Sequence, residues 1–386
     1  MSFREKNPPS VATAAVVRRP KTVSPVGKGG LLLLAVLLAG LTACAPGTHT
    51  AYVTLPTDNA VAAFRIRNVS AAFTTIVGSP YLTGNSPGPV VMHPSGSFVY
   101  VANRIDNNIS LFRVNSLIGS LSEVLPRTAT ALDPVAMIMN AAGNLLFVAN
   151  EVSSSISVYS INSGTGALSL VTGPPVSLPP SPVALALTPS GNFLYVANSN
   201  LGSVFAFSVA SSGALQPVAG SPFASGAGAF AFGVDPGGKF VYVANSSADT
   251  LSVLAIASNG ALTQVSGSPF ATGTGPVSVA VSTKGLYVYI ANQSSNNITE
   301  YSIDTTTGFA TEIIGSPLSA GTAPSLLVPD PDGNFIYVMS QTSKTITPYT
   351  ISTTAATNTS GTGALTSTTV ESVTLSSAAG GMAVSK

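Results

Sequence analysis

The six residues Phe98–Asn103, read as FVYVAN, decide the fold because the chain repeats them. Near-copies of this segment end at Asn198, Asn245 and Asn292. A run of apolar residues rich in β-branched and aromatic side chains predicts a strand that is buried on both faces. A strand of this kind that recurs along the chain predicts a fold built from repeated units.

The repeat has a regular period of 47 or 48 residues. Each unit holds four strand-like segments separated by turns that contain Gly and Pro. Antiparallel four-stranded units of about 40 to 50 residues are typical of propeller blades. Residues 51–386 are therefore predicted to form an all-β, seven-bladed β-propeller of four-stranded antiparallel blades. The aromatic residues that mark the seven units are Tyr52, Tyr100, Phe147, Tyr195, Tyr242, Tyr289 and Tyr337.

The two ends of the repeat region complement each other. The chain from Ala51 begins at the second strand of a blade, with no inner strand before it. The last residues, 375–386, have the pattern of an inner strand with no blade after it. We expect this C-terminal strand to join the first blade and close the ring, which would leave no long sheet edge exposed.

The composition excludes two classes of protein. Only 8% of the 386 residues are charged and 45% are hydrophobic, which is not the composition of a disordered chain. After the first 43 residues the chain has nine basic and thirteen acidic residues. With no basic stripe to neutralise phosphates, nucleic acid is not an expected partner.

Residues 1–43 have the pattern of a secretory signal: a basic segment, then an apolar run from Leu31 too short to span a bilayer comfortably. The end of this segment, Leu41–Cys44, resembles a bacterial lipobox. The resemblance implies cleavage before Cys44, lipid on its sulfur and membrane anchoring through residues 44–50 as a tether. The alternative is an ordinary signal peptide with an incidental cysteine.

The predicted localisation is therefore outside the cytoplasm, with the chain anchored to the cell envelope. Ala45 is not the aspartate associated with inner-membrane retention, which favours the outer membrane if the cell has one. Since Cys44 is the only cysteine, the exported domain is expected to fold without disulfides.

The repeated strand ends in asparagine at positions 103, 150, 198, 245 and 292. An asparagine at a strand end commonly satisfies backbone groups of the adjoining turn, which is the structural interpretation. The functional alternative is a ring of amides, in which Asn103 and Asn150 would bind a ligand.

These segments, together with the Gly-Ser-Pro-Phe turns, resemble the YVTN-repeat propellers and the seven-bladed lactonase family over residues 51–386. The named activity of that family is 6-phosphogluconolactone hydrolysis, which implies a lactone hydrolase without a cofactor. The resemblance also implies His, Arg and Glu around the channel mouth. Here the two histidines are expected elsewhere, His49 in the tether and His93 in a turn on the opposite, bottom face.

Charged residues gather on one face of the predicted ring, which we call the top. On this face the loops after the repeated strands lie beside the loops before the inner strands. Adjacent loops of the second and third blades carry Arg104, Asp106, Arg127, Asp133 and Glu151. Glu151 is the candidate base that activates water, and Arg104 the candidate contact for the carbonyl oxygen or a phosphate. Asp106, Arg127 and Asp133 are candidate binding residues. The alternative is a set of solvated surface ion pairs.

The sequence is compatible with two functions. One is a hydrolase of lactones or similar cyclic esters; the other is a non-catalytic propeller that binds a ligand or an envelope protein. No metal site is predicted, because histidine and cysteine are too few for structural zinc and no spaced acidic loop suggests calcium. Asp235, Asp330 and Asp332 are expected to form turns on the bottom face.

Overall fold

The computed structural model describes residues 47–171, 176–353 and 362–385. The predicted signal segment 1–43 and Cys44 lie outside the described residues. All that follows concerns the unit formed by residues 43–386. Within the described residues, no helix is long and apolar enough to cross a membrane.

The described chain folds into seven antiparallel sheets. The inner strands are β5 (Pro87–Met92), β9 (Pro134–Met139), β14 (Pro182–Leu187), β19 (Ala229–Val234), β24 (Pro276–Val281), β29 (Pro324–Pro329) and β34 (Gly381–Val384). The second strands are β1 (Thr48–Leu55), β6 (Phe98–Asn103), β10 (Leu145–Asn150), β15 (Phe193–Asn198), β20 (Phe240–Asn245), β25 (Tyr287–Asn292) and β30 (Phe335–Ser340). The third strands are β2 (Ala60–Arg67), β7 (Asn108–Val114), β11 (Ser155–Ile161), β16 (Ser203–Val209), β21 (Thr250–Ile256), β26 (Asn297–Ile303) and β31 (Thr345–Ile351).

The fourth strand of six blades is split into two short strands that both pair with the third strand. These are β3 (Phe73–Thr75) and β4 (Tyr81–Leu82), β12 (Leu168–Leu170) and β13 (Val176–Ser177), β17 (Leu215–Pro217) and β18 (Phe223–Ala224), β22 (Leu262–Gln264) and β23 (Phe270–Ala271), β27 (Ala310–Glu312) and β28 (Leu318–Ser319), and β32 (Leu365–Ser367) and β33 (Val373–Thr374). The second blade keeps one continuous strand, β8 (Leu121–Ala129).

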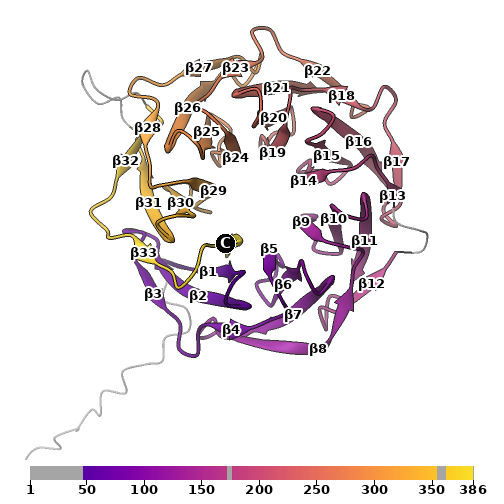
Figure 1. The fold of residues 1–386 in the computed structure, drawn as a ribbon, viewed down its shortest axis with the longest axis vertical. Helices are drawn as coiled ribbons and strands as arrows, with labels where there is room; N and C mark the ends of the chain where they lie inside the picture. The colour runs from indigo at the N-terminus through magenta and orange to yellow at the C-terminus, as the bar shows by residue number, and fades with distance from the viewer. Residues whose placement is uncertain (1–46, 172–175, 354–361, 386) are drawn as a thin grey trace, which may run out of the picture. The chain divides into compact units, whose positions relative to one another are not determined.

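The seven sheets form a closed ring with the inner strands around a central axis (Figure 1). Each inner strand contacts the next, and β34 lies between β29 and β5. The predicted seven-bladed propeller of antiparallel blades is confirmed. We use "top" for the end of the ring where the second strands finish and "bottom" for the end where the inner strands finish.

The C-terminal strand closes the ring as expected. β34 pairs antiparallel with β1, from Ala51 opposite Val384 to Thr54 opposite Gly381. β1 begins at Thr48, three residues before the predicted domain boundary, because Thr48 still pairs with Arg67 of β2.

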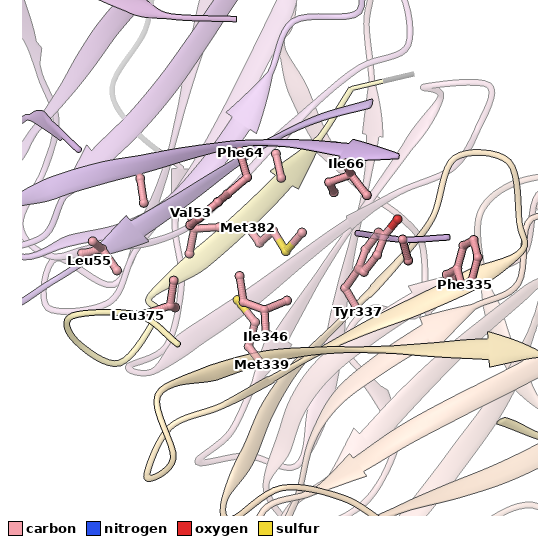
Figure 2. Close-up of a cluster of buried hydrophobic side chains, with 13 residues drawn as sticks. Val53, Leu55, Phe64, Ile66, Phe335, Tyr337, Met339, Ile346, Leu375 and Met382 are labelled. Atoms are coloured by element: carbon pink, nitrogen blue, oxygen red, sulfur yellow. The ribbon is translucent and has the colours of Figure 1, made fainter. Parts of the chain in front are cut away.

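The core is divided among the interfaces between neighbouring blades. Between the last and first blades, side chains of β30 and β31 pack against those of β1, β2 and β34 (Figure 2). Here Tyr337 and Met339 of the last blade join Val53, Phe64 and Met382 of the first. Each blade thus covers the apolar face of the next, which explains why one buried strand is repeated. All seven buried clusters are built from residues between 51 and 384.

The repeated tyrosine adds a hydrogen bond between blades. The Tyr100 hydroxyl donates to the carbonyl oxygen of Gly166, at 2.8 Å, in the turn between β11 and β12 of the next blade. Gly166 has a φ of +76°, and a Cβ there would lie 2.7 Å from the ring of Phe98. The same bond joins Tyr52 to Gly119, Tyr195 to Gly260 and Tyr289 to Gly363.

Replacing Tyr100 by Phe should lower the free energy of unfolding by about 1 to 3 kcal/mol, because it leaves the buried Gly166 carbonyl without its donor. Tyr242 is the matched control, since its buried hydroxyl has no partner among the described residues. Urea denaturation should show Tyr242→Phe unchanged or stabilised. Equal losses in the two variants would refute the inter-blade bond as the reason for tyrosine.

Candidate functional site: the channel mouth

A cavity of about 340 Å³ opens at the top of the ring, where loops of the first, second, third and last blades meet. Its lining includes Ser86, Gly88, Ser325 and Gln341, and Arg104 is the only ionisable side chain among the lining residues that the structure describes. Ligands of such cavities are held by a few polar groups on an otherwise neutral wall.

Below the mouth lies a channel segment of about 320 Å³ that shares lining residues with it. All seven inner strands contribute to this channel, and its lining side chains are apolar apart from Ser278. One side chain from each strand is Val90, Met137, Leu185, Phe232, Val279, Leu327 and Met382. No ionisable side chain lines this channel segment among the described residues, so the charged group available to a ligand is Arg104 at the mouth.

The loops at the mouth are fixed by backbone bonds that repeat from blade to blade. The amide of Arg104 donates to the carbonyl of Ser86, and the amide of Glu151 donates to that of Asp133. Asp133 has a φ of +58°, and its amide donates to the side chain of Asn107 at 2.7 Å. Each loop after a second strand is thereby held against the segment that enters the inner strand.

Asp133 and Glu151 lie beside Arg104 at the edge of the mouth, and of the three only Arg104 lines the cavity. The Arg104 guanidinium donates two hydrogen bonds to the Asp133 carboxylate, from Nε at 2.7 Å and from Nη2 at 2.9 Å. The same Nη2 lies 3.6 Å from Oε2 of Glu151. The hydrogen bond to Asp133 raises the pKa of Arg104, so the guanidinium stays charged. Glu151 is about one-third exposed and so remains accessible to water.

Arg127 and Asp106 belong to a neighbouring ion-pair group. The prediction that Arg127 lies in a loop is wrong, because it lies in strand β8, which pairs with β7. Arg127 donates to Glu123 at 2.7 Å, and its Nη1 lies 3.8 Å from Asp106. Two hydrogen bonds from Asn85, one from its backbone and one from its side chain, lower the pKa of Asp106. Glu123 was not predicted, because its contact with Arg127 spans the irregular part of the pairing between β8 and β7.

The strand-end asparagines are fully buried. Asn103 accepts hydrogen bonds from the Thr83 hydroxyl and the Gly84 amide, and its amide group donates to Asn108 and Ser110. The amide of Asn150 donates to Ser157 at 3.0 Å. These contacts fit the structural interpretation, and neither Asn103 nor Asn150 is accessible to a ligand.

Neither histidine lies at the mouth. His93 is buried in a bottom turn, where Nε2 lies 2.9 Å from the Gly143 carbonyl and Nδ1 lies 2.8 Å from the Ser95 hydroxyl. His49 was expected in the tether, and that placement is wrong. It is buried in β1, beside Asp330 and Asp332 on the bottom face.

The family of seven-bladed β-propeller lactonases matches residues 42–183, 174–271, 219–317 and 279–370. The chain belongs to this lactonase family. A candidate 6-phosphogluconolactonase of Bacteroides fragilis has a similar structure, with a TM-score of 0.77 and 19% identity over 88% of this chain and 99% of that one. The Pseudomonas aeruginosa periplasmic gluconolactonase has a TM-score of 0.74 and 18% identity over the same shares. At these identities the similarity concerns the fold. No curated protein sequence matched the chain.

A second carboxyl with an altered environment, Glu300, lies away from the mouth and was not predicted. Glu300 of β26 is 2% exposed and accepts a hydrogen bond from the amide of Leu365 in β32 of the last blade. Burial raises its pKa to about 7, and the Leu365 bond opposes part of this rise. No lining residue of the mouth is in this contact, so its role is structural.

Glu300→Gln should stabilise the protein at pH 8 by up to about 3 kcal/mol and have little effect at pH 4. Between the ordinary pKa of 4.5 and about 7, the folded chain binds more protons here than the unfolded chain, so stability falls as pH rises through this window. Gln keeps the acceptor for Leu365 without the charge. Denaturant titrations at the two pH values measure the difference, and equal effects at both would contradict the assignment.

Proposed function

We propose that this chain is an exported, lipid-anchored lactonase that hydrolyses an uncharged lactone at the mouth of its channel. Membership of the lactonase family supports the activity. The observation that carries the site is the position of Arg104, which lines the mouth cavity and lies 3.6 Å from the accessible carboxylate of Glu151.

In this proposal Glu151 takes a proton from the water that attacks the lactone carbonyl carbon. The Arg104 guanidinium donates hydrogen bonds to the oxyanion that develops on the carbonyl oxygen. When the ring C–O bond breaks, the departing oxygen takes the proton from Glu151, and the product is a hydroxy acid. Asp133 positions Arg104 through its two hydrogen bonds.

The charge around Arg104 favours a substrate without a phosphate. Asp133 and Glu151 together outnumber the single positive charge of Arg104. No second cation lines the cavity among the residues that the structure describes. A phosphate would therefore meet net negative charge, whereas the hydroxyl groups of a neutral sugar lactone would meet Ser86, Ser325 and Gln341.

The test is a hydrolysis assay on residues 45–386 with paired neutral and phosphorylated sugar lactones. We expect kcat/KM to be larger for the neutral member of each pair. A preference for the phosphorylated member would overturn the substrate assignment, and no turnover of any lactone would overturn the activity.

Export and anchoring are proposed from the sequence Leu41–Cys44. Cells that express the full chain should incorporate labelled fatty acid into the protein, and Cys44→Ala should abolish the label. A label that persists in the variant would contradict lipidation at this cysteine.

The second candidate is a non-catalytic binding propeller. It is favoured by the two carboxylates that already neutralise Arg104 and by the lack of a histidine at the mouth among the described residues. Saturable binding of neutral sugars without turnover of the corresponding lactones would select this function.

A further inference from the structure

His49, Asp330 and Asp332 form a compact group on the bottom face, where the first and last blades meet. His49 belongs to β1 of the first blade, and the two aspartates belong to the turn after β29 of the last blade. One possible ligand atom from each side chain lies within 4.8 Å of the other two. This group is separate from the channel mouth and independent of the proposed lactonase activity.

The distances in this group match those between ligands of a small metal ion. Nε2 of His49 lies 3.1 Å from Oδ2 of Asp332 and 3.6 Å from Oδ1 of Asp330. Ligands bound tetrahedrally at about 2.0 to 2.1 Å from a zinc ion are about 3.4 Å from one another. The two distances lie on either side of that value, and the shorter one is that of a hydrogen bond between His49 and Asp332.

The burial of the group is that of a partly open site. The side chains of His49 and Asp330 are 6% and 0% exposed, whereas that of Asp332 is 44% exposed. A buried carboxylate and imidazole need a compensating charge or a full set of hydrogen bonds. An ion can reach them from the side of Asp332 and keep water as a further ligand.

Asp330 differs from the aspartate at the matching turn of another blade. Asp235, which follows β19, accepts hydrogen bonds from three backbone amides of its own turn at 2.6 to 3.0 Å. Asp330 receives one amide, from Asn334 at 3.3 Å, and the hydroxyl of Tyr337 at 3.2 Å. The carboxylate of Asp330 thus receives fewer hydrogen bonds from its turn than that of Asp235 does, and its Oδ1 faces His49. Hydrogen bonds of this kind orient metal ligands from behind.

One side chain of this group and one beside it carry buried polar atoms without a partner among the described residues. They are Nδ1 of His49 and Oδ1 of Asn68. The Asn68 amide donates to Oδ2 of Asp332 at 2.7 Å. A half-turn of that amide would bring its oxygen towards the carboxylates, an arrangement that is unfavourable unless a cation lies between them. Of the two atoms, only Oδ1 of Asn68 can therefore become a ligand, because Nδ1 of His49 points away from the carboxylates that Nε2 faces.

We propose that His49, Asp330 and Asp332 bind a divalent transition-metal ion of the zinc class, with Asn68 or water as a further ligand. One imidazole and two carboxylates suit zinc better than magnesium or calcium, which prefer oxygen ligands alone. Because the ligands come from both ends of the propeller, the ion joins the first and last blades. Metal binding therefore stabilises the closed ring.

Calorimetric titration of chelator-treated residues 45–386 with zinc chloride tests the proposal. This fragment contains all seven buried clusters and lacks Cys44, which would itself bind zinc. We expect one zinc ion per chain, visible absorption bands when cobalt(II) replaces zinc, and a melting temperature that rises with zinc and not with magnesium.

Asp332→Asn should weaken zinc binding by at least about tenfold while leaving the fold intact, because Asp332 is partly exposed. His49→Gln should also weaken binding. Asp304→Asn is the matched control, since Asp304 is an exposed turn aspartate that forms no ion pair among the described residues. This variant should bind zinc as the parent protein does. No binding by the parent protein, or equal binding by the parent protein and Asp332→Asn, would show that the group is only an ion pair.

Discussion

Removal of the last ten residues, 377–386, should unfold the propeller or lower its melting temperature by more than about 10 °C. The deletion removes β34, whose four residues pair with β1 from Ala51 to Thr54. It also removes Met382 from the cluster between the last and first blades. The edge of β1 would then be exposed and the ring would lose its closing contacts.

Thermal unfolding followed by circular dichroism measures this effect. A chain that lacks only Lys386 is the control, because β34 ends at Val384. Its melting temperature should equal that of the full-length protein. Met382→Ala should give an intermediate loss of about 2 to 5 kcal/mol. A ten-residue deletion with an unchanged melting temperature would mean that β34 does not hold the ring closed.

Glu151→Gln should lower kcat for lactone hydrolysis by at least about 100-fold, because glutamine cannot accept the proton of the attacking water. Arg104→Ala should cause a comparable loss in kcat/KM through the missing oxyanion donor. Both side chains are partly exposed, so neither change should greatly alter stability.

The matched control for these variants is Arg127→Ala. Arg127 lies in β8, where it pairs with Glu123, and among the described residues it forms no ion pair with Arg104, Asp133 or Glu151. Activity should therefore stay near that of the parent protein. Parent-level activity in both Glu151→Gln and Arg104→Ala would rule out this pair, even for a chain that hydrolyses lactones. An equal loss in all three variants would indicate a general disturbance of the loops.

The propeller could be predicted from the sequence because each blade has the same burial requirement. The strand FVYVAN is buried at every residue in β6 and β20, and its period gives the number of blades directly. The C-terminal closure followed from the missing inner strand of the first blade. The inter-blade bond of Tyr100 could not be derived, because its acceptor Gly166 lies 66 residues away.

The mouth could be predicted only in outline. The period places Arg104, Asp133 and Glu151 on neighbouring top loops. It does not predict the two hydrogen bonds between Arg104 and Asp133, which depend on the positive φ of Asp133. The inaccessibility of Asn103 likewise depends on Thr83 and Gly84, which belong to the preceding connection.

The position of His49 shows the limit of local patterns. The repeat pattern of the first blade begins at Ala51, whereas pairing with β2 extends β1 back to Thr48. The aspartates beside His49 are more than 280 residues away, across the closure of the ring. Glu300 is comparable, because its burial depends on the strand that contains Leu365 in the next blade.

The most direct test of the central claim is a crystal structure of residues 45–386 with the lactam of a neutral sugar lactone, an analogue that resists hydrolysis. We predict that the lactam occupies the mouth cavity, with its carbonyl oxygen bonded to Arg104 and its carbonyl carbon facing a water held by Glu151. A lactam bound elsewhere on the protein, or none bound at concentrations that saturate the protein in solution, would contradict the account.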